Sequence, residues 1–222
     1  MLVCKITNNV NISIMKRILL SAIVILSTIL TYAETRKEYF TLSLMSVDVN
    51  SNEVDSTSIT NVTLDVSSIN YYTDSVMSIS FMPQLTHFDF VIKNNTDKTI
   101  KIIWDESMFF KGNVSDKVFH SGVVIKDRMN QQSPSSILKG MELSDIIIPC
   151  SNVSFNSYFG RWVYNFMLFQ EKDNGEVLKI LLPISINDEI VEYVFTFKAE
   201  YHKARVKYRI SGDGLCYYVK LK

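Results

Sequence analysis

Residues 177–198 read VLKILLPISINDEIVEYVFTFK, and this stretch decides the fold class. On both sides of Asn187-Asp188 an apolar residue recurs at every second position. A period of two is that of a β-strand with one buried face, and Asn-Asp is typical of a tight turn. The stretch therefore predicts an antiparallel hairpin, and one face of its second strand is made of Val191, Tyr193, Phe195 and Phe197.

The same period recurs through most of the chain after residue 38. Residues 88–93 and 100–104 alternate on either side of a polar loop rich in Asn and Asp, which predicts a second hairpin. The runs 161–169 and 177–186 lie on either side of the turn residues Asp173-Asn174-Gly175, which predicts a third hairpin.

The last two alternating runs, 205–210 and 215–221, are separated by Ser-Gly-Asp-Gly, the strongest turn signal in the chain. Further strands are predicted over residues 39–49, 58–66 and 76–81. One helical turn is predicted near 135–143, where Gly140 argues against a long helix.

About ten mostly antiparallel strands with short turns and no alternation of strands and helices predict an all-β protein, most simply a β-sandwich. A closed barrel is the alternative. The 222 residues are 47% hydrophobic and 12% aromatic, which excludes a disordered chain and suits a single domain over residues 34–222.

An export signal is predicted for residues 1–33. Lys16-Arg17 precede the uncharged apolar run 18–30, and Thr31 and Ala33 put small side chains at the −3 and −1 positions of a cleavage site. As a helix this run would be about 20 Å long, which is short for a bilayer core of roughly 30 Å. Residues 1–14 are polar, so Met15 is a plausible true start. No cysteine lies near the cleavage site, so we expect an exported protein, periplasmic or extracellular, without a lipid anchor.

Charge excludes one class of partner. The 23 basic and 23 acidic residues balance, so no long-range field attracts nucleic acid. Removing the leader takes away three basic residues and leaves a net charge of −3. Membrane contact is expected only through the signal sequence before cleavage.

The stretch Phe88-x-Phe-x-Ile-x-Asn-Asn-Thr-Asp-x-x-Ile-x-Ile resembles the second and third strands of immunoglobulin-like modules in exported bacterial proteins. Ile137-Leu138-Lys139-Gly140, followed by Leu143 and Asp145, is similar to a strand after a glycine turn in such modules. The resemblance covers roughly residues 86–200. It implies an immunoglobulin-like β-sandwich and no particular chemistry.

Two cysteines, Cys150 and Cys216, remain after cleavage at Ala33. In an oxidising compartment they are candidates for a disulfide, and the alternative is two separate buried thiols. Their spacing fits neither a zinc nor a redox motif. No cofactor or metal motif is present in the sequence, so we expect neither.

Four residues are weak candidates for a binding site: Trp104, His120, Arg128 and Trp162. His120 lies near Ser121 and Asp127, which favours a hydrolase only if a nucleophile elbow accompanies them, and Ser-Gly is half of one. Trp104 and Trp162 would serve a small-ligand carrier at the mouth of a sandwich. Alternating Lys and Arg along 203–209 would suit acidic glycans or lipid headgroups, or the protection of an edge strand from aggregation.

These observations predict a non-catalytic binding or structural module in the cell envelope or secreted space, whose partner is an envelope protein or a glycan. The alternatives are the hydrolase centred on His120 and the small-ligand carrier.

Overall fold

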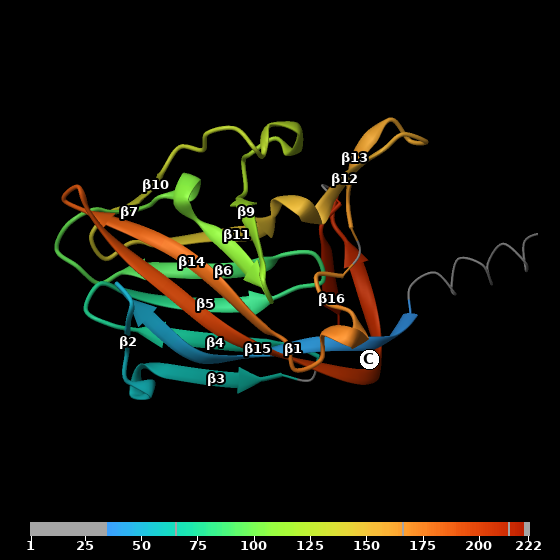
Figure 1. Ribbon diagram of the computed structural model, residues 1–222, viewed down its shortest axis with the longest axis horizontal. Coiled ribbons are helices and arrows are strands. Elements are labelled where there is room, and N and C mark those ends of the chain that lie inside the picture. The colour runs from blue at the N-terminus through green and yellow to red at the C-terminus, as the bar shows by residue number, and fades with distance from the viewer. Residues whose placement is uncertain (1–34, 65, 166, 213, 220–222) are drawn as a thin grey trace, which may run out of the picture. The chain divides into compact units, whose positions relative to one another are not determined.

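The computed structural model of the protein describes residues 35–64, 66–165, 167–212 and 214–219, and within them the side chains of 39–203 (bar 65 and 166), 210–212 and 214–216 (Figure 1). Contacts divide the chain into Met1–Arg36 and Lys37–Lys222. The predicted signal sequence, its cleavage site and the alternative start at Met15 lie outside the described residues. The fold below is that of the second unit.

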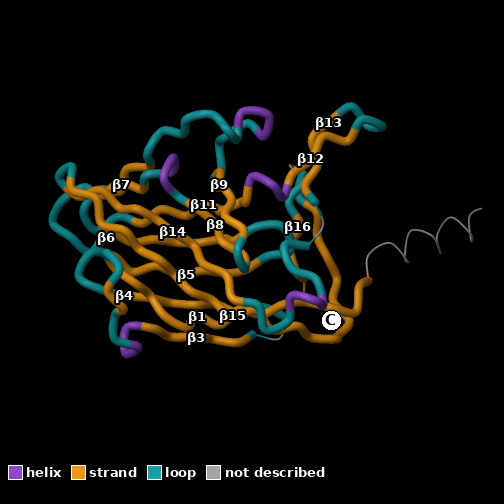
Figure 2. Tube along the Cα trace, in the orientation of Figure 1, coloured by secondary structure: helices purple, strands orange, loops and turns teal. Residues whose placement is uncertain are grey.

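The fold is all-β, as the sequence predicts. Fourteen of the strands in the described ranges form one antiparallel, curled sheet with the main order β2-β1-β15-β14-β8-β9-β11-β6-β5-β4-β3, while β12 and β13 pair separately. Helical structure in this part of the chain consists of 3-10 turns of three residues (Figure 2). No helix in the described ranges has the length and apolarity that crossing a membrane requires. The strands are β1 (Thr35–Val49), β2 (Asn52–Glu53), β3 (Ile59–Thr63), β4 (Ser68–Thr73), β5 (Met77–Pro83), β6 (Phe88–Asn94), β7 (Ile100–Ile102), β8 (Met108–Lys111), β9 (Val114–Phe119), β10 (Ser135–Ile137), β11 (Glu142–Pro149), β12 (Val153–Asn156), β13 (Arg161–Tyr164), β14 (Val177–Ile186), β15 (Glu189–Ile210) and β16 (Cys216–Val219).

The hairpin predicted from residues 177–198 is confirmed. β14 and β15 pair from Ile186↔Glu189 to Val177↔Lys198, and Asn187 and Asp188 both adopt positive φ in the turn. β15 then continues to Ile210, so two predicted strands are one. The final turn is also confirmed, because Ile210 pairs with Cys216.

Two predicted hairpins are wrong. β6 pairs with β5 and β11, whereas β7 pairs with β10 and β14. The side-chain amide of buried Asn94 donates to the carbonyls of Lys98, in the polar loop, and Ile137, at the end of β10. These bonds connect the end of β6 with β10, and β7 does not return alongside β6. Likewise Arg161–Tyr164 pairs with β12 and not with β14.

The helical turn predicted near residues 135–143 is also wrong. Strands β10 and β11 occupy this region, and Gly140 joins them with a φ of +69°. A positive φ ends any helical path, and the backbone N–H of Gly140 donates to the carbonyl of Asn94. β4 was not among the predicted strands.

The sheet curls around a core rich in aromatic rings, where the Phe81 ring lies 4.9 Å from that of Phe195 and 5.4 Å from that of Phe197. The curl brings β1 against β3 and β4. The side-chain amide of Asn61 accepts the backbone N–H of Leu44 and donates to its carbonyl, and the amide of Asn70 donates to the carbonyl of Leu42. Side chains thus replace a strand ladder at this seam.

Candidate functional site

The most exposed apolar surface of the described chain is the hairpin of β12 and β13, which projects from the rest of the fold (Figure 1). Its tip is the sequence NSYFG at 156–160. Asn156 Oδ1 accepts the backbone N–H of Phe159 at 3.1 Å, and Gly160 has a φ of +61°. These two residues fix a tight turn that holds the intervening side chains outward.

The hairpin exposes three aromatic rings to solvent. Tyr158 is 89% exposed, Phe159 62% and Phe155 54%. Tyr158 and Phe159 lie edge to face at 5.0 Å, and Phe155 packs on Trp162 across the strand pair at 5.6 Å. Large apolar side chains gathered on a projecting element are typical of a contact surface for a partner.

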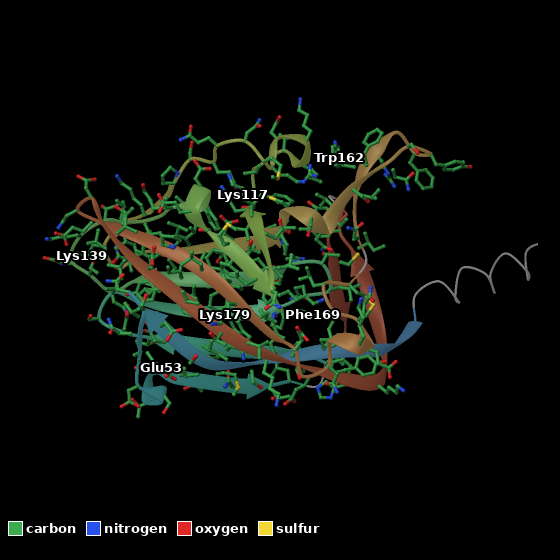
Figure 3. All side chains as sticks on the ribbon, viewed as in Figure 1. Glu53, Lys117, Lys139, Trp162, Phe169 and Lys179 are labelled. Carbon is green, nitrogen blue, oxygen red and sulfur yellow. The ribbon has the colours of Figure 1, made fainter. Side chains whose placement is uncertain are left out.

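Arg128 packs against the side of the hairpin at Trp162, which pairs with Phe155. Its guanidinium carbon lies 4.4 Å from the centre of the Trp162 ring, and its N–H groups donate to the carbonyls of Cys150 and Ile125, both at 3.0 Å. Figure 3 labels Trp162 on this hairpin. The arginine therefore links the hairpin to a small second core, which contains Cys150 and Leu215.

A groove of about 580 Å³ runs between β13 and the turn that joins β15 to β16. Its volume lies in the range of small-molecule sites. The hairpin and Asn165, which follows it, contribute rings, one cation and two amides to the groove, and the turn contributes Ile210, Ser211 and two glycines. The hairpin residues that line it include Asn156, Phe159, Arg161, Trp162 and Tyr164.

A second candidate site is a pair of titratable residues: His120, directly after β9, and Asp145, within β11. His120 Nδ1 lies 3.0 Å from Asp145 Oδ2, and the side chains are 15% and 4% exposed. The imidazole stacks on Trp104 at 4.3 Å with the rings 5° from parallel. Trp104 is buried, and its indole N–H donates to Ser135 Oγ at 2.8 Å.

Asp145 is held in its charged form by hydrogen bonds. Burial raises the pKa of its carboxyl, but bonds from His120 and Ser121 and the backbone N–H groups of Ile146 and Ser121 outweigh this, so the net shift is downward. A charged carboxylate that orients an imidazole is found beside the histidine that acts as a general base. The same contact can also be purely structural and hold β11 to the end of β9.

The contacts of the predicted hydrolase residues differ from the predicted ones. His120 meets Asp145, while Asp127 accepts from the side chain of Asn130. Ser121 contacts the same carboxylate as His120 does. Asp145 was missed by sequence reasoning, although a lone carboxylate before the apolar run Ile146–Ile148 signals a buried charge in need of a partner.

The four weak candidates fall into two pairs, Trp104 with His120 and Arg128 with Trp162. Trp104 belongs to the main core, whereas Trp162 lines the groove. The exposed rings of the hairpin were missed by sequence reasoning, because the run 161–169 was interpreted as a partner of 177–186. The side chains of residues 204–209, part of the predicted cationic strand, lie outside the described residues.

Cys150 and Cys216 are both buried, and no disulfide joins them. Their sulfurs lie near the backbone carbonyls of Arg128 and Gly214, respectively. The structure therefore has the second of the two arrangements that the sequence left open.

Comparisons with protein-family models, with curated proteins and with solved structures find no match for this chain.

Proposed function

We propose that the protein is an exported binding module whose contact surface is the β12–β13 hairpin together with the adjoining groove. The observation that carries this proposal is the exposure of Phe155, Tyr158 and Phe159 on one projecting element. Exposing these rings to water costs free energy that a partner would recover by covering them.

The hairpin is built to hold those rings in place before a partner arrives. The side chain of Asn156 fixes its tip, and Arg128 packs on Trp162 in β13. A preorganised surface loses little conformational entropy on association, so more of its contact energy appears as affinity. Tyr and Trp also combine apolar area with a polar group, which suits them to interfaces.

The location that goes with this role is the cell envelope or the secreted space, where the partner would be an envelope protein or glycan. Support comes from the sequence of residues 16–33 alone. Expression in a secreting host followed by N-terminal sequencing should give a mature chain that starts at Glu34. An intracellular chain that retains residues 1–33 would contradict the location.

The contact surface is tested by co-sedimentation of the purified protein with cell-envelope fractions. We expect a Tyr158→Ser, Phe159→Ser double variant to lose most of the binding, because it removes the two rings at the tip. The matched control is Val177→Ser, which changes another exposed apolar residue on β14, away from the hairpin. Unchanged binding by the double variant, with the fold intact by circular dichroism, would refute the proposal.

A hydrolase is the second candidate, and the pairing of His120 with Asp145 is the observation that favours it. If the protein is a hydrolase, His120→Ala should abolish hydrolysis. If it is a pure binding module, the same variant should leave envelope binding intact. Turnover of ester or glycoside substrates that disappears in this variant would move the function to the hydrolase.

The finer architecture is also part of the proposal. We infer that the curled sheet is a variant of the immunoglobulin-like sandwich, on the strength of the strand sequence at residues 88–102. An experimental structure whose strands assemble into two packed sheets would support this assignment.

A further inference from the structure

We propose that the groove beside β13 binds an acidic saccharide, a sugar chain that carries carboxylate groups. This inference rests on the proposed function, since it names the ligand class of the same surface. The groove combines aromatic rings, an amide donor and a cation that forms no ion pair with any described residue, and each of these groups matches one part of such a ligand.

The cation is Arg161. Its guanidinium carbon lies 5.6 Å from the Phe159 ring, and no carboxylate among the described residues forms an ion pair with it. A guanidinium presents N–H groups in a planar fork that binds both oxygens of a carboxylate. An exposed arginine at the wall of a groove is therefore suited to a carboxylate ligand.

The amide donor lies directly across the hairpin from that cation. Asn156 pairs with Arg161 in the register of β12 and β13, which puts their Cβ atoms roughly 5 Å apart on one face. Asn156 Oδ1 is occupied by the backbone N–H of Phe159, and its Nδ2 has no partner among the described residues. A guanidinium and an amide N–H can thus converge on one anionic group.

The aromatic part comes from Phe159, Trp162 and Tyr164, which all line the groove. Phe159 lies beside the Arg161 guanidinium, while Trp162 and Tyr164 alternate with Arg161 along β13 and contribute from the other face of the strand. A pyranose has an apolar face of C–H groups and a rim of hydroxyls. Aromatic rings cover the former, while amide and guanidinium groups bond the latter. This mixture of rings and donors favours a saccharide over a fully apolar ligand, and Arg161 favours an acidic one.

The test uses the full-length protein and its two tryptophans. Trp104 is buried in the core and Trp162 lines the groove, so a ligand-dependent change in fluorescence reports on Trp162. The probes are trigalacturonic acid, the neutral galactose trisaccharide of equal length, and triglutamate as an acidic peptide. We expect the uronic acid oligomer to bind most tightly, by titration of fluorescence and by calorimetry.

The diagnostic variant is Arg161→Gln, which removes the cation and keeps a polar side chain. We expect it to weaken binding of the uronic acid oligomer by roughly 10- to 100-fold, the usual effect of losing hydrogen bonds to a charged group. Binding of the neutral oligomer should change little. Lys139→Gln is the matched control for charge, because Figure 3 shows Lys139 at the opposite end of the fold from Trp162.

Three outcomes would overturn the inference: no binding of the uronic acid oligomer, equal binding of the acidic and neutral oligomers, or preferential binding of triglutamate. Each can be distinguished from failure of the proposed function. If the tip variant still loses envelope binding, the contact surface stands and only the ligand class is wrong. If the tip variant keeps envelope binding, the contact surface itself is wrong.

Discussion

Replacing Asp145 by Asn tests whether the His120–Asp145 pair stabilises the fold as a charged clamp. Asn retains the size and one acceptor oxygen, but it removes the negative charge. Oδ1 accepts the N–H groups of Ser121 and Ile146 at 2.9 and 2.8 Å, and Oδ2 lies 3.0 Å from His120. The change therefore weakens three contacts at once.

The expected loss is about 2 kcal/mol at pH 7. A hydrogen bond to a charged group contributes roughly 1.5–3 kcal/mol, and one between neutral groups contributes about 1. Replacing three charged hydrogen bonds by neutral ones therefore costs a few kcal/mol. Part of this cost is offset, because burying a neutral amide is less unfavourable than burying a carboxylate. The carboxylate of Asp145 is 4% exposed, so water screens these contacts little.

The effect should depend on pH with a defined sign. The pKa of Asp145 is lowered in the folded protein, so the charged carboxylate stabilises the fold fully above the usual aspartate pKa near 4. That contribution is lost as the pH falls through the lower, folded pKa. The difference in stability between the native protein and Asp145→Asn should therefore shrink below about pH 4.

Urea denaturation followed by tryptophan fluorescence, at pH values from 7 down to 3, measures this difference. The control is Asp127→Asn, the carboxylate that the sequence placed beside His120, which should change stability by no more than about 0.5 kcal/mol. A difference for Asp145→Asn that is the same at every pH, or that is absent at pH 7, would show that the charge of Asp145 does not hold the clamp.

Three further outcomes follow from buried polar groups. Tyr193→Phe should lower the free energy of unfolding, measured by urea denaturation, by about 2 kcal/mol, because the Tyr193 hydroxyl donates to Asp74 at 2.8 Å. Burial, and then Asp74, raise the pKa of Tyr193, so its contribution persists through pH 10 and its ionisation, followed by ultraviolet absorbance, should appear only on unfolding. Asn70→Ala should cost roughly 1–3 kcal/mol by leaving the carbonyl of Leu42 unsatisfied; a melting temperature equal to that of the native protein would count against the side-chain seam. Burial, and then Asp116, raise the pKa of the Cys150 thiol to about 11, so a thiol reagent at pH 8 should label it slowly until urea is added, as peptide mass mapping can check.

The candidate site was only partly predictable from the sequence. Trp162 and Arg128 were both candidates, yet their contact joins residues 34 positions apart through a guanidinium over a ring. Spacing along the chain carries no information about such a contact. Asp145 shows the same limit, because it lies in β11 while His120 follows β9, and the pairing of β9 with β11 brings the two together.

The all-β class and the hairpin at residues 177–198 were determined by the sequence alone. Both follow from local rules, since a period of two defines a strand face and Asn187-Asp188 accepts the positive φ of a tight turn. Which strands pair over long distances was decided by the tertiary structure. Residues 88–104 alternate as a hairpin would, but Asn94 bonds the carbonyl of Ile137, 43 positions away, and the two strands separate. A strand pattern specifies the buried face of a strand and leaves its neighbour open, because many partners offer the same backbone groups.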